Sequence, residues 1–233
     1  MQLFYTPNIN AATYTLDKEE STHCVRVLRL KEGSQIYLTD GKGNLYKAQL
    51  LSANLKECVA EIIETIANYG KRDFYLHIAI APTKNIDRFE WFLEKATEIG
   101  IDEITPIFCE HSERNVVKPE RLQKIITSAV KQSLKAYHPI LNEAVKFNQL
   151  IANDFYGKKY IAHCENDEKN ALHLAYKKGE NALILIGPEG DFSVAEIKKA
   201  IENKYQPISL GNSRLRTETA GIVACHTINL LNE

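Results

Sequence analysis

The chain has 233 residues, 44% of them hydrophobic, and a formal net charge of −1 at pH 7. This length suffices for one large domain or two modest ones, and the hydrophobic content supports a buried core. No run approaches the roughly 18 apolar residues of a membrane span, and the first residues lack the basic and apolar blocks of a secretory signal. The cytoplasm is therefore the expected location.

The five cysteines are scattered along the chain and include no close pair of the kind that binds zinc or forms a redox disulfide. His163 and Cys164 are adjacent, but no second pair at ligand spacing accompanies them. We therefore expect reduced cysteines and no metal. Because the net charge is close to zero, a nucleic-acid-binding function would need a local basic surface.

The first seventy residues predict a small β-barrel or β-sandwich. Alternating apolar residues indicate strands at 35–40, 45–53 and 58–66. A helix is expected to begin at Asp17, with Glu20 completing a capping box. The polar, glycine-containing segment 67–73 marks a domain boundary. We thus predict one domain over residues 1–70 and a second over residues 74–233.

The remainder of the chain alternates between predicted strands and helices. Strands are expected at 75–81, 104–109 and 160–164, and helices at 87–100, 119–137 and 217–231. Residues 142–159 show no clear pattern. Such alternation predicts an α/β domain with a mainly parallel sheet and helices on both faces.

Two segments near the C-terminus each predict a buried strand, a glycine loop and the start of a helix. The first contains Gly187-Pro-Glu-Gly190, and the second contains Leu210-Gly-Asn-Ser-Arg-Leu-Arg-Thr-Glu-Thr-Ala220. Open α/β sheets bind small ligands at such loops. Neither loop has the lysine and hydroxyl of a phosphate loop, and Glu189 would repel phosphate. A neutral or cationic ligand therefore fits better than a nucleoside triphosphate.

These motifs resemble those of one family, the RsmE family of small-subunit ribosomal RNA uridine N3-methyltransferases in the SPOUT superfamily. Two further segments match, His23-Cys-Val-Arg-Val-Leu-Arg29 and Glu94-Lys-Ala-Thr-Glu-Ile-Gly100, and the order is that of the family. The resemblance implies an α/β protein with an N-terminal PUA-like β-barrel that binds RNA. The C-terminal SPOUT domain would contain a deep trefoil knot and dimerise.

The resemblance further implies S-adenosyl-L-methionine as the methyl donor, and N3 of one uridine, U1498 in the family, of 16S ribosomal RNA as the target. The partners would be 16S rRNA or the small ribosomal subunit and a second copy of the chain. Two alternatives remain open. The chain could be a related SPOUT enzyme that acts on another base or on a ribose 2′-OH, or an RNA-binding protein without catalytic activity.

The two glycine loops supply the candidate methyl-donor site. The implied donor-binding residues are Leu185, Ile186, Gly187, Pro188, Glu189, Gly190, Leu210, Gly211, Leu215, Arg216, Thr219 and Ala220. Asp191 stands where the family usually has a second glycine, but aspartate tolerates unusual backbone angles.

Arg216 and Glu218 are the candidate catalytic residues. A cation near the uracil would stabilise the negative charge that develops as N3 loses its proton, and Arg216 is the candidate for that role. Glu218 could accept the proton, bind the amino group of methionine, or simply favour the start of a helix.

Basic residues in two regions are candidates for RNA contact. On the predicted helix 119–137, one face gathers Arg121, Lys124, Lys131 and Lys135, opposite Leu122, Ile126 and Ala129. In the N-terminal domain the candidates are His23, Arg26 and Arg29. An ordinary solvated surface explains the helical stripe equally well, and His23 also suits a structural hydrogen-bonding role.

Overall fold

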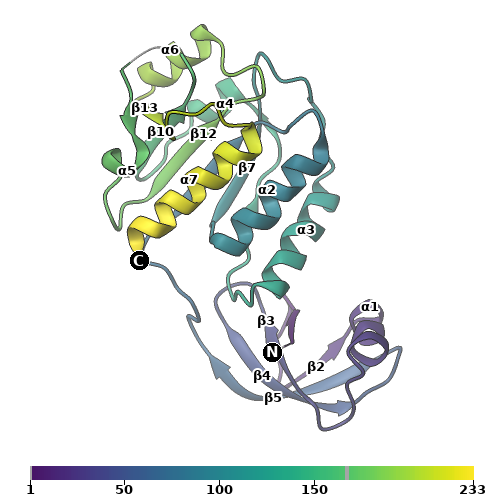
Figure 1. Ribbon diagram of the computed structural model, residues 1–233. Helices are drawn as coiled ribbons and strands as arrows, with labels where there is room; N and C mark the ends of the chain where they lie inside the picture. Colours follow the sequence, from purple (N-terminus) through teal and green to yellow (C-terminus); the bar gives the residue numbers. More distant parts are fainter. Residues whose placement is uncertain (1, 166–167) are drawn as a thin grey trace. The chain divides into compact units, whose positions relative to one another are not determined.

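The computed structural model describes residues 2–165 and 168–233 and divides the chain into two compact units (Figure 1). The first unit contains the chain up to Lys71 together with residues 127–138, and the second contains residues 72–126 and 139–233. Residues 127–138 thus group with the first unit, whereas the sequence boundaries assigned them to the second domain. Among the described helices, none is both long enough and apolar enough to cross a membrane.

The first unit is built on a five-stranded sheet in the order β1-β3-β4-β5-β2. The strands are β1 (Leu3–Tyr5), β2 (Thr13–Leu16), β3 (Gln35–Thr39), β4 (Leu45–Ser52) and β5 (Cys58–Ile66). The three predicted strands are confirmed, whereas β1 and β2 were not foreseen because three or four residues are too few to show a period. The strand order is linear, and no pairing between β1 and β2 is recorded among the described residues, so closure of the sheet into the predicted barrel stays a prediction.

The predicted N-terminal helix is confirmed at its start and changes its geometry after one turn. Asp17 Oδ1 accepts a hydrogen bond of 2.8 Å from the backbone N–H of Glu20, which caps helix α1 (Lys18–Thr22). The chain then continues as a π-helix, η1 (His23–Val27), and Arg29 adopts a left-handed φ of 53°. Single-turn π-helices and left-handed non-glycine residues are both uncommon and frequently occur at functional sites.

The second unit contains a parallel sheet of eight strands, in the order β11-β13-β10-β12-β6-β7-β8 with β9 also paired to β7. The strands are β6 (Leu76–Ile80), β7 (Glu103–Phe108), β8 (Ile140–Leu141), β9 (Val145–Lys146), β10 (Lys158–Ala162), β11 (Asn170–Ala171), β12 (Ala182–Ile186) and β13 (Gln206–Ser209). Every recorded pair in this sheet is parallel, which confirms the sequence prediction.

Six helices belong wholly or partly to this unit: α2 (Ile86–Ile99), α3 (Pro119–Gln132), α4 (Phe147–Ile151), α5 (Leu172–Ala175), α6 (Val194–Glu202) and α7 (Thr217–Asn232). Helix α3 ends at Gln132, before the predicted Tyr137, and Leu134 adopts a left-handed φ of 57°. The segment 142–159, which gave no pattern, contains β9, α4 and the start of β10. Each of these elements is too short for a periodic signal.

Helices cover the two faces of the parallel sheet. On one face, Leu183 and Leu185 of β12 join a core cluster with residues of α4 and α6. On the other face, α2 and α7 contact each other, and α7 also contacts β6 and β12 (Figure 1). Residues of β6 and β12 are buried throughout because both strands are central and covered on both sides. The strand order does not establish the trefoil knot, which stays a prediction.

A buried histidine near the start of β6 makes the stability of this unit dependent on pH. His77 is 5% exposed, and its Nε2 lies 2.7 Å from Thr105 Oγ1. Burial lowers the pKa of His77 from 6.5 to about 4, although the nearby Glu103 carboxylate opposes the shift. The unfolded chain therefore takes up the proton first, and stability falls as the pH drops below 6.5.

We expect the free energy of unfolding to fall by up to about 3 kcal/mol between pH 7 and pH 4 because of His77. The H77Q variant lacks this titration. Urea unfolding of the wild type and of H77Q at several pH values in this range isolates the contribution of His77. The other titratable groups are the same in both proteins, so their effects cancel in the difference between the two free energies of unfolding. If the difference in free energy of unfolding between the two proteins did not change with pH, the lowered pKa of His77 would be contradicted.

Candidate functional site

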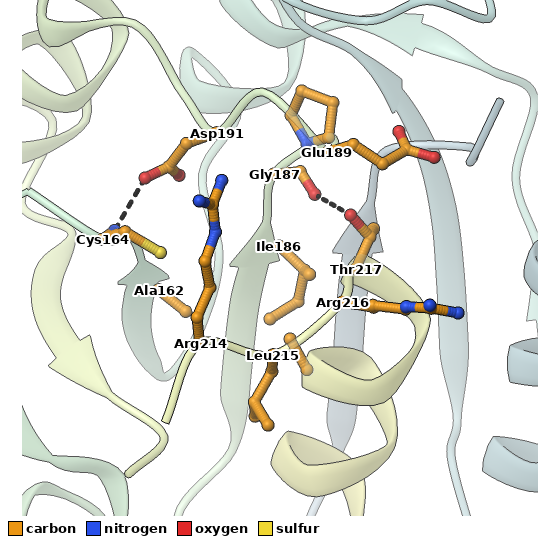
Figure 2. A pocket seen from close by; sticks show the side chains of 12 residues that line it. Ala162, Cys164, Ile186, Gly187, Glu189, Asp191, Arg214, Leu215, Arg216 and Thr217 are labelled. Atoms are coloured by element: carbon orange, nitrogen blue, oxygen red, sulfur yellow. Dashed lines mark hydrogen bonds between the residues drawn. The ribbon is translucent and has the colours of Figure 1, made fainter. Parts of the chain in front are cut away.

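A pocket of about 270 Å³ lies at the carboxyl ends of β10 and β12, beside the first turn of α7 (Figure 2). Its lining residues come from the ends of these elements: Ala162, Cys164, Ile186, Gly187, Pro188, Glu189, Asp191, Arg214, Leu215, Arg216, Thr217 and Ala220. This is the edge at which parallel α/β sheets bind ligands. The structure thus brings parts of the two predicted glycine loops together around one cavity.

A buried hydrogen bond joins the two loops. The hydroxyl of Thr217, the first residue of α7, donates to the carbonyl oxygen of Gly187 over 3.0 Å (Figure 2). A Cβ atom at Gly187 would lie 3.1 Å from the ring of Phe192, so a larger residue would push the loop away. Close approach, not a left-handed backbone, therefore explains this glycine.

Asp191 supports the first loop in place of the usual glycine. Its φ is 63°, so the position requires the left-handed conformation that glycine would adopt freely and that aspartate tolerates. Its Oδ2 accepts a hydrogen bond of 2.7 Å from the backbone N–H of Cys164, and its Oδ1 accepts one of 2.8 Å from Phe192. The departure from the family pattern therefore adds a link between the first loop and the segment that follows β10.

Two residues from distant segments hold the first loop in place. Glu189 Oε1 accepts a hydrogen bond of 2.9 Å from the backbone N–H of Lys84, after β6, while Glu189 Oε2 is buried without a recorded partner among the described residues. His111, after β7, has its Nδ1 3.1 Å from the carbonyl oxygens of Gly190 and Asp191. No local motif distinguishes Lys84 or His111, so sequence reasoning missed both.

Seven of the twelve predicted methyl-donor residues line the pocket: Ile186, Gly187, Pro188, Glu189, Leu215, Arg216 and Ala220. Five do not: Leu185, Gly190, Leu210, Gly211 and Thr219. The side chain of Leu185 faces the cluster beneath α4 and α6, because consecutive strand residues point to opposite faces and Ile186 takes the pocket side. The prediction did not include the lining residues Ala162, Cys164, Asp191, Arg214 and Thr217.

The two candidate catalytic residues have different surroundings. Arg216 is the exposed N-cap residue of α7 and lines the pocket, where its side chain points away from Arg214 (Figure 2). Glu218 is 7% exposed and does not line the pocket. Its Oε1 lies 3.9 Å from Arg88 Nε. Because the positive end of the helix also favours this carboxylate, its position fits the helix-start interpretation best.

The candidate RNA-binding residues of the first unit lie on the surface. His23, Arg26 and Arg29 are all exposed, and Val27 between them is 65% exposed. Cys24, within the same π-helix, is fully buried in the core of the unit. The π-helix thus presents its basic side chains outward while Cys24 anchors it, an arrangement suited to contacting phosphates.

The basic stripe predicted on α3 is partly neutralised. Arg121 Nε lies 2.5 Å from Glu90 Oε1, and Lys131 Nζ lies 2.6 Å from Glu20 Oε1. Lys124 is exposed, whereas Lys135 lies beyond the end of the helix. The structure therefore does not place four unpaired basic residues on one face of α3. The helix ends before Lys135, and carboxylates pair with Arg121 and Lys131. The buried face, with Leu122, Ile126 and Ala129, is as predicted.

Within residues 2–165 and 168–233, no three His, Cys, Asp or Glu side chains are grouped so that they could hold a metal ion. The pocket instead offers two carboxylates, two guanidinium groups, backbone groups and an apolar wall. Such a lining suits an organic ligand that carries charges of both signs.

Cys164 provides a reporter for this pocket. It is the exposed cysteine of the five, and the other four are buried. Burial and the Asp191 carboxylate raise the pKa of the Cys164 thiol, although Arg214 and Lys169 oppose the shift. Since the thiolate is the reactive form, we expect one thiol to react with Ellman's reagent, with a rate that rises as the pH approaches this raised pKa.

A ligand in the pocket should slow the labelling of Cys164, and C164S should lack the reactive thiol. Stopped-flow absorbance with and without S-adenosylhomocysteine measures both effects. A reactive thiol that persists in C164S would show that a buried cysteine becomes accessible in solution.

Comparisons with known proteins agree with this architecture. Residues 71–229 match the RNA methyltransferase domain family, and residues 16–63 match the RNA methyltransferase PUA domain family. The chain is 32% identical to ribosomal RNA small subunit methyltransferase E of Synechocystis over 95% of this chain and 74% of the relative.

Two solved structures are also similar. A probable rRNA-methyltransferase from Porphyromonas gingivalis superposes with a TM-score of 0.93 at 41% identity, over 100% of this chain and 98% of the other. Ribosomal RNA small subunit methyltransferase E from Neisseria gonorrhoeae, solved with bound S-adenosyl methionine, gives a TM-score of 0.86 at 26% identity, over 100% and 98% of the two chains.

The fold and the pocket therefore define an RNA methyltransferase with an attached PUA domain. More closely, the chain belongs to the family of ribosomal RNA small subunit methyltransferase E. The family resemblance inferred from the loop motifs is confirmed, and so is S-adenosyl-L-methionine as the methyl donor of this family.

Proposed function

We propose that the chain transfers a methyl group from S-adenosyl-L-methionine to N3 of a uridine in 16S ribosomal RNA. The observation that supports this most strongly is the pocket itself, in which both glycine loops and the start of α7 surround one cavity. The family supports methylation of small-subunit rRNA. The uridine and its N3 atom follow from the resemblance of the loop motifs.

The pocket residues fit the charge of this methyl donor. Glu189 lines the pocket and keeps a buried oxygen without a recorded hydrogen bond among the described residues. Asp191 adds a second carboxylate to the same lining. Two carboxylates favour a ligand with a positively charged sulfonium and an ammonium group. Ile186, Leu215 and Ala220 supply the apolar surface that an adenine would need.

The bound methyl donor would supply the electrophilic methyl group. The contribution of the chain would be to position the uracil and to stabilise its charge. As N3 releases its proton to water, negative charge develops on the uracil, and Arg216 at the pocket edge would stabilise it until N3 accepts the methyl group and S-adenosylhomocysteine leaves. We propose that Glu218 holds the first turn of α7 in place, since it is buried beside Arg88 and does not line the pocket.

The proposal includes RNA binding by the first unit through His23, Arg26 and Arg29. It also includes a homodimer and the family's trefoil knot. On α7, Ile222 and Val223 are only partly buried and Leu230 is 54% exposed, which leaves apolar surface for a second copy. Sedimentation of the purified chain tests the dimer.

Methylation of RNA in vitro tests the proposed reaction. The purified chain would be incubated with labelled S-adenosylmethionine and with 16S rRNA, either free or in small subunits, that lacks the modification. Mass spectrometry of the digested nucleosides should then show N3-methyluridine. A 2′-O-methylated nucleoside or another methylated base would indicate a related reaction, and no product on either substrate would contradict catalysis.

A further inference from the structure

Arg214 is a second arginine of the pocket, and the proposed transfer of the methyl group leaves it without a role. Its side chain runs from the second glycine loop toward Asp191, whereas the side chain of Arg216 points in a different direction (Figure 2). It lies close enough to Cys164 to favour the thiolate, although burial and Asp191 raise the pKa of that thiol overall. The guanidinium is therefore located on the side of the pocket that contains Cys164 and Asp191.

Among the described residues around Arg214, none makes a recorded hydrogen bond or ion pair with its guanidinium. Both oxygens of Asp191 already accept backbone hydrogen bonds, Oδ2 from Cys164 and Oδ1 from Phe192. Lys169, another cation close to Cys164, donates to the carbonyl oxygens of His163 and Glu165. For Arg214 itself, no hydrogen bond or ion pair is recorded within the described part of the chain. Among the described residues, no recorded acceptor occupies the donors that it could offer to a ligand.

We propose that the guanidinium of Arg214 binds the carboxylate of the methionine part of the methyl donor and thereby makes the pocket selective for ligands that carry this carboxylate. The inference rests on the proposed function, which supplies the ligand. The ligand has three charged groups, a sulfonium, an ammonium and a carboxylate. The two acidic residues of the lining suit the first two, and the carboxylate requires a cation.

Arginine suits this role because its planar fork donates two parallel hydrogen bonds to a carboxylate. The other arginine of the lining, Arg216, points away from Arg214 and is assigned to the uracil (Figure 2). Arg214 is exposed, so water competes for its hydrogen bonds. We therefore expect a contribution to affinity of roughly 10-fold or somewhat more, typical of hydrogen bonds to charged groups.

Calorimetry with two ligands that differ only in the carboxylate tests the proposal. The full-length wild type, R214A, R214K and the control variant K198A would each be titrated with S-adenosylhomocysteine and with its decarboxylated analogue, in the absence of RNA. We expect R214A to weaken binding of S-adenosylhomocysteine by roughly 10-fold and to leave binding of the analogue nearly unchanged. K198A removes an exposed cation of α6 that does not line the pocket, so it should change neither affinity by more than about 2-fold.

The possible outcomes separate this proposal from the one on which it rests. If R214A weakened the binding of both ligands equally, the carboxylate contact would be overturned and a general effect on the pocket would be indicated. Unchanged binding of both ligands, with a raised KM for RNA, would overturn it in favour of a phosphate contact. If the wild type bound neither ligand, the proposed function itself would fail. Thermal unfolding of each variant shows whether the fold is intact. An affinity of R214K for S-adenosylhomocysteine between those of R214A and the wild type would support a charge contact.

Discussion

Replacing Arg216 with alanine is expected to lower the rate of methyl transfer by roughly 100-fold to 1,000-fold, as the loss of a group that stabilises developing charge typically does. The structure places Arg216 at the edge of the pocket, at the N-cap of α7, without a side-chain capping hydrogen bond. Its side chain is therefore not required to hold the helix start. The loss should appear in kcat, while the affinity for S-adenosylhomocysteine should stay within about 2-fold of the wild type.

Single-turnover methyl transfer and calorimetry measure these two effects separately. R216K is the matched variant, because it keeps the charge but loses the planar fork. Partial activity in R216K would indicate that charge dominates, and activity as low as in R216A would indicate that the fork geometry is required. Full activity in R216A would remove Arg216 from the mechanism.

The second large effect is expected at Gly221, where α7 packs against α2. A Cβ atom at Gly221 would lie 2.6 Å from Phe92 Cε2 and 2.9 Å from Ile80 Cδ1. Alanine favours a helix by about 1 kcal/mol over glycine, but this contact is too close to persist without movement. We expect G221A to destabilise the protein by about 1–3 kcal/mol, the usual cost of overpacking a core.

Urea unfolding of G221A measures this loss, and a double mutant identifies its cause. F92L shortens the side chain that the new methyl group meets, so G221A should cost less in the F92L background than in the wild type. Because α7 carries the pocket residues Arg216, Thr217 and Ala220, its displacement should also weaken methyl-donor binding. A G221A variant as stable as the wild type would show that the two helices separate easily.

The sequence predicted the parts of the fold that depend on local patterns. The alternation of apolar runs and amphipathic segments after residue 74 predicted the parallel α/β sheet, because strand and helix periods differ. The hydrophobic face of α3 and the cap at Asp17 were likewise predictable, since both are properties of a few neighbouring residues. Short elements such as β1, β2 and α4 were not predictable, because too few residues are present to show a period.

The candidate site was likewise predictable from the sequence only where it depends on residues close together in the chain. The sequence indicated that residues 185–190 and 210–220 form ligand loops, and seven of the predicted residues line the pocket. It could not indicate that Asp191 accepts a hydrogen bond from Cys164, or that Glu189 accepts one from Lys84, since these pairs are far apart in the chain. Nor could it show that carboxylates pair with Arg121 and Lys131 and so neutralise part of the basic stripe on α3.

The sequence by itself thus determined the class of fold, the family and the two loops around the pocket, because each follows from residues that are close together along the chain. Only the tertiary structure decided which side chains face the cavity. Packing of α7 against β6 and β12 brings Arg214 and Arg216 to the carboxyl ends of the strands, and pleating turns Ile186 toward the pocket and Leu185 away from it. Contacts between distant segments, which no local pattern records, fix these directions.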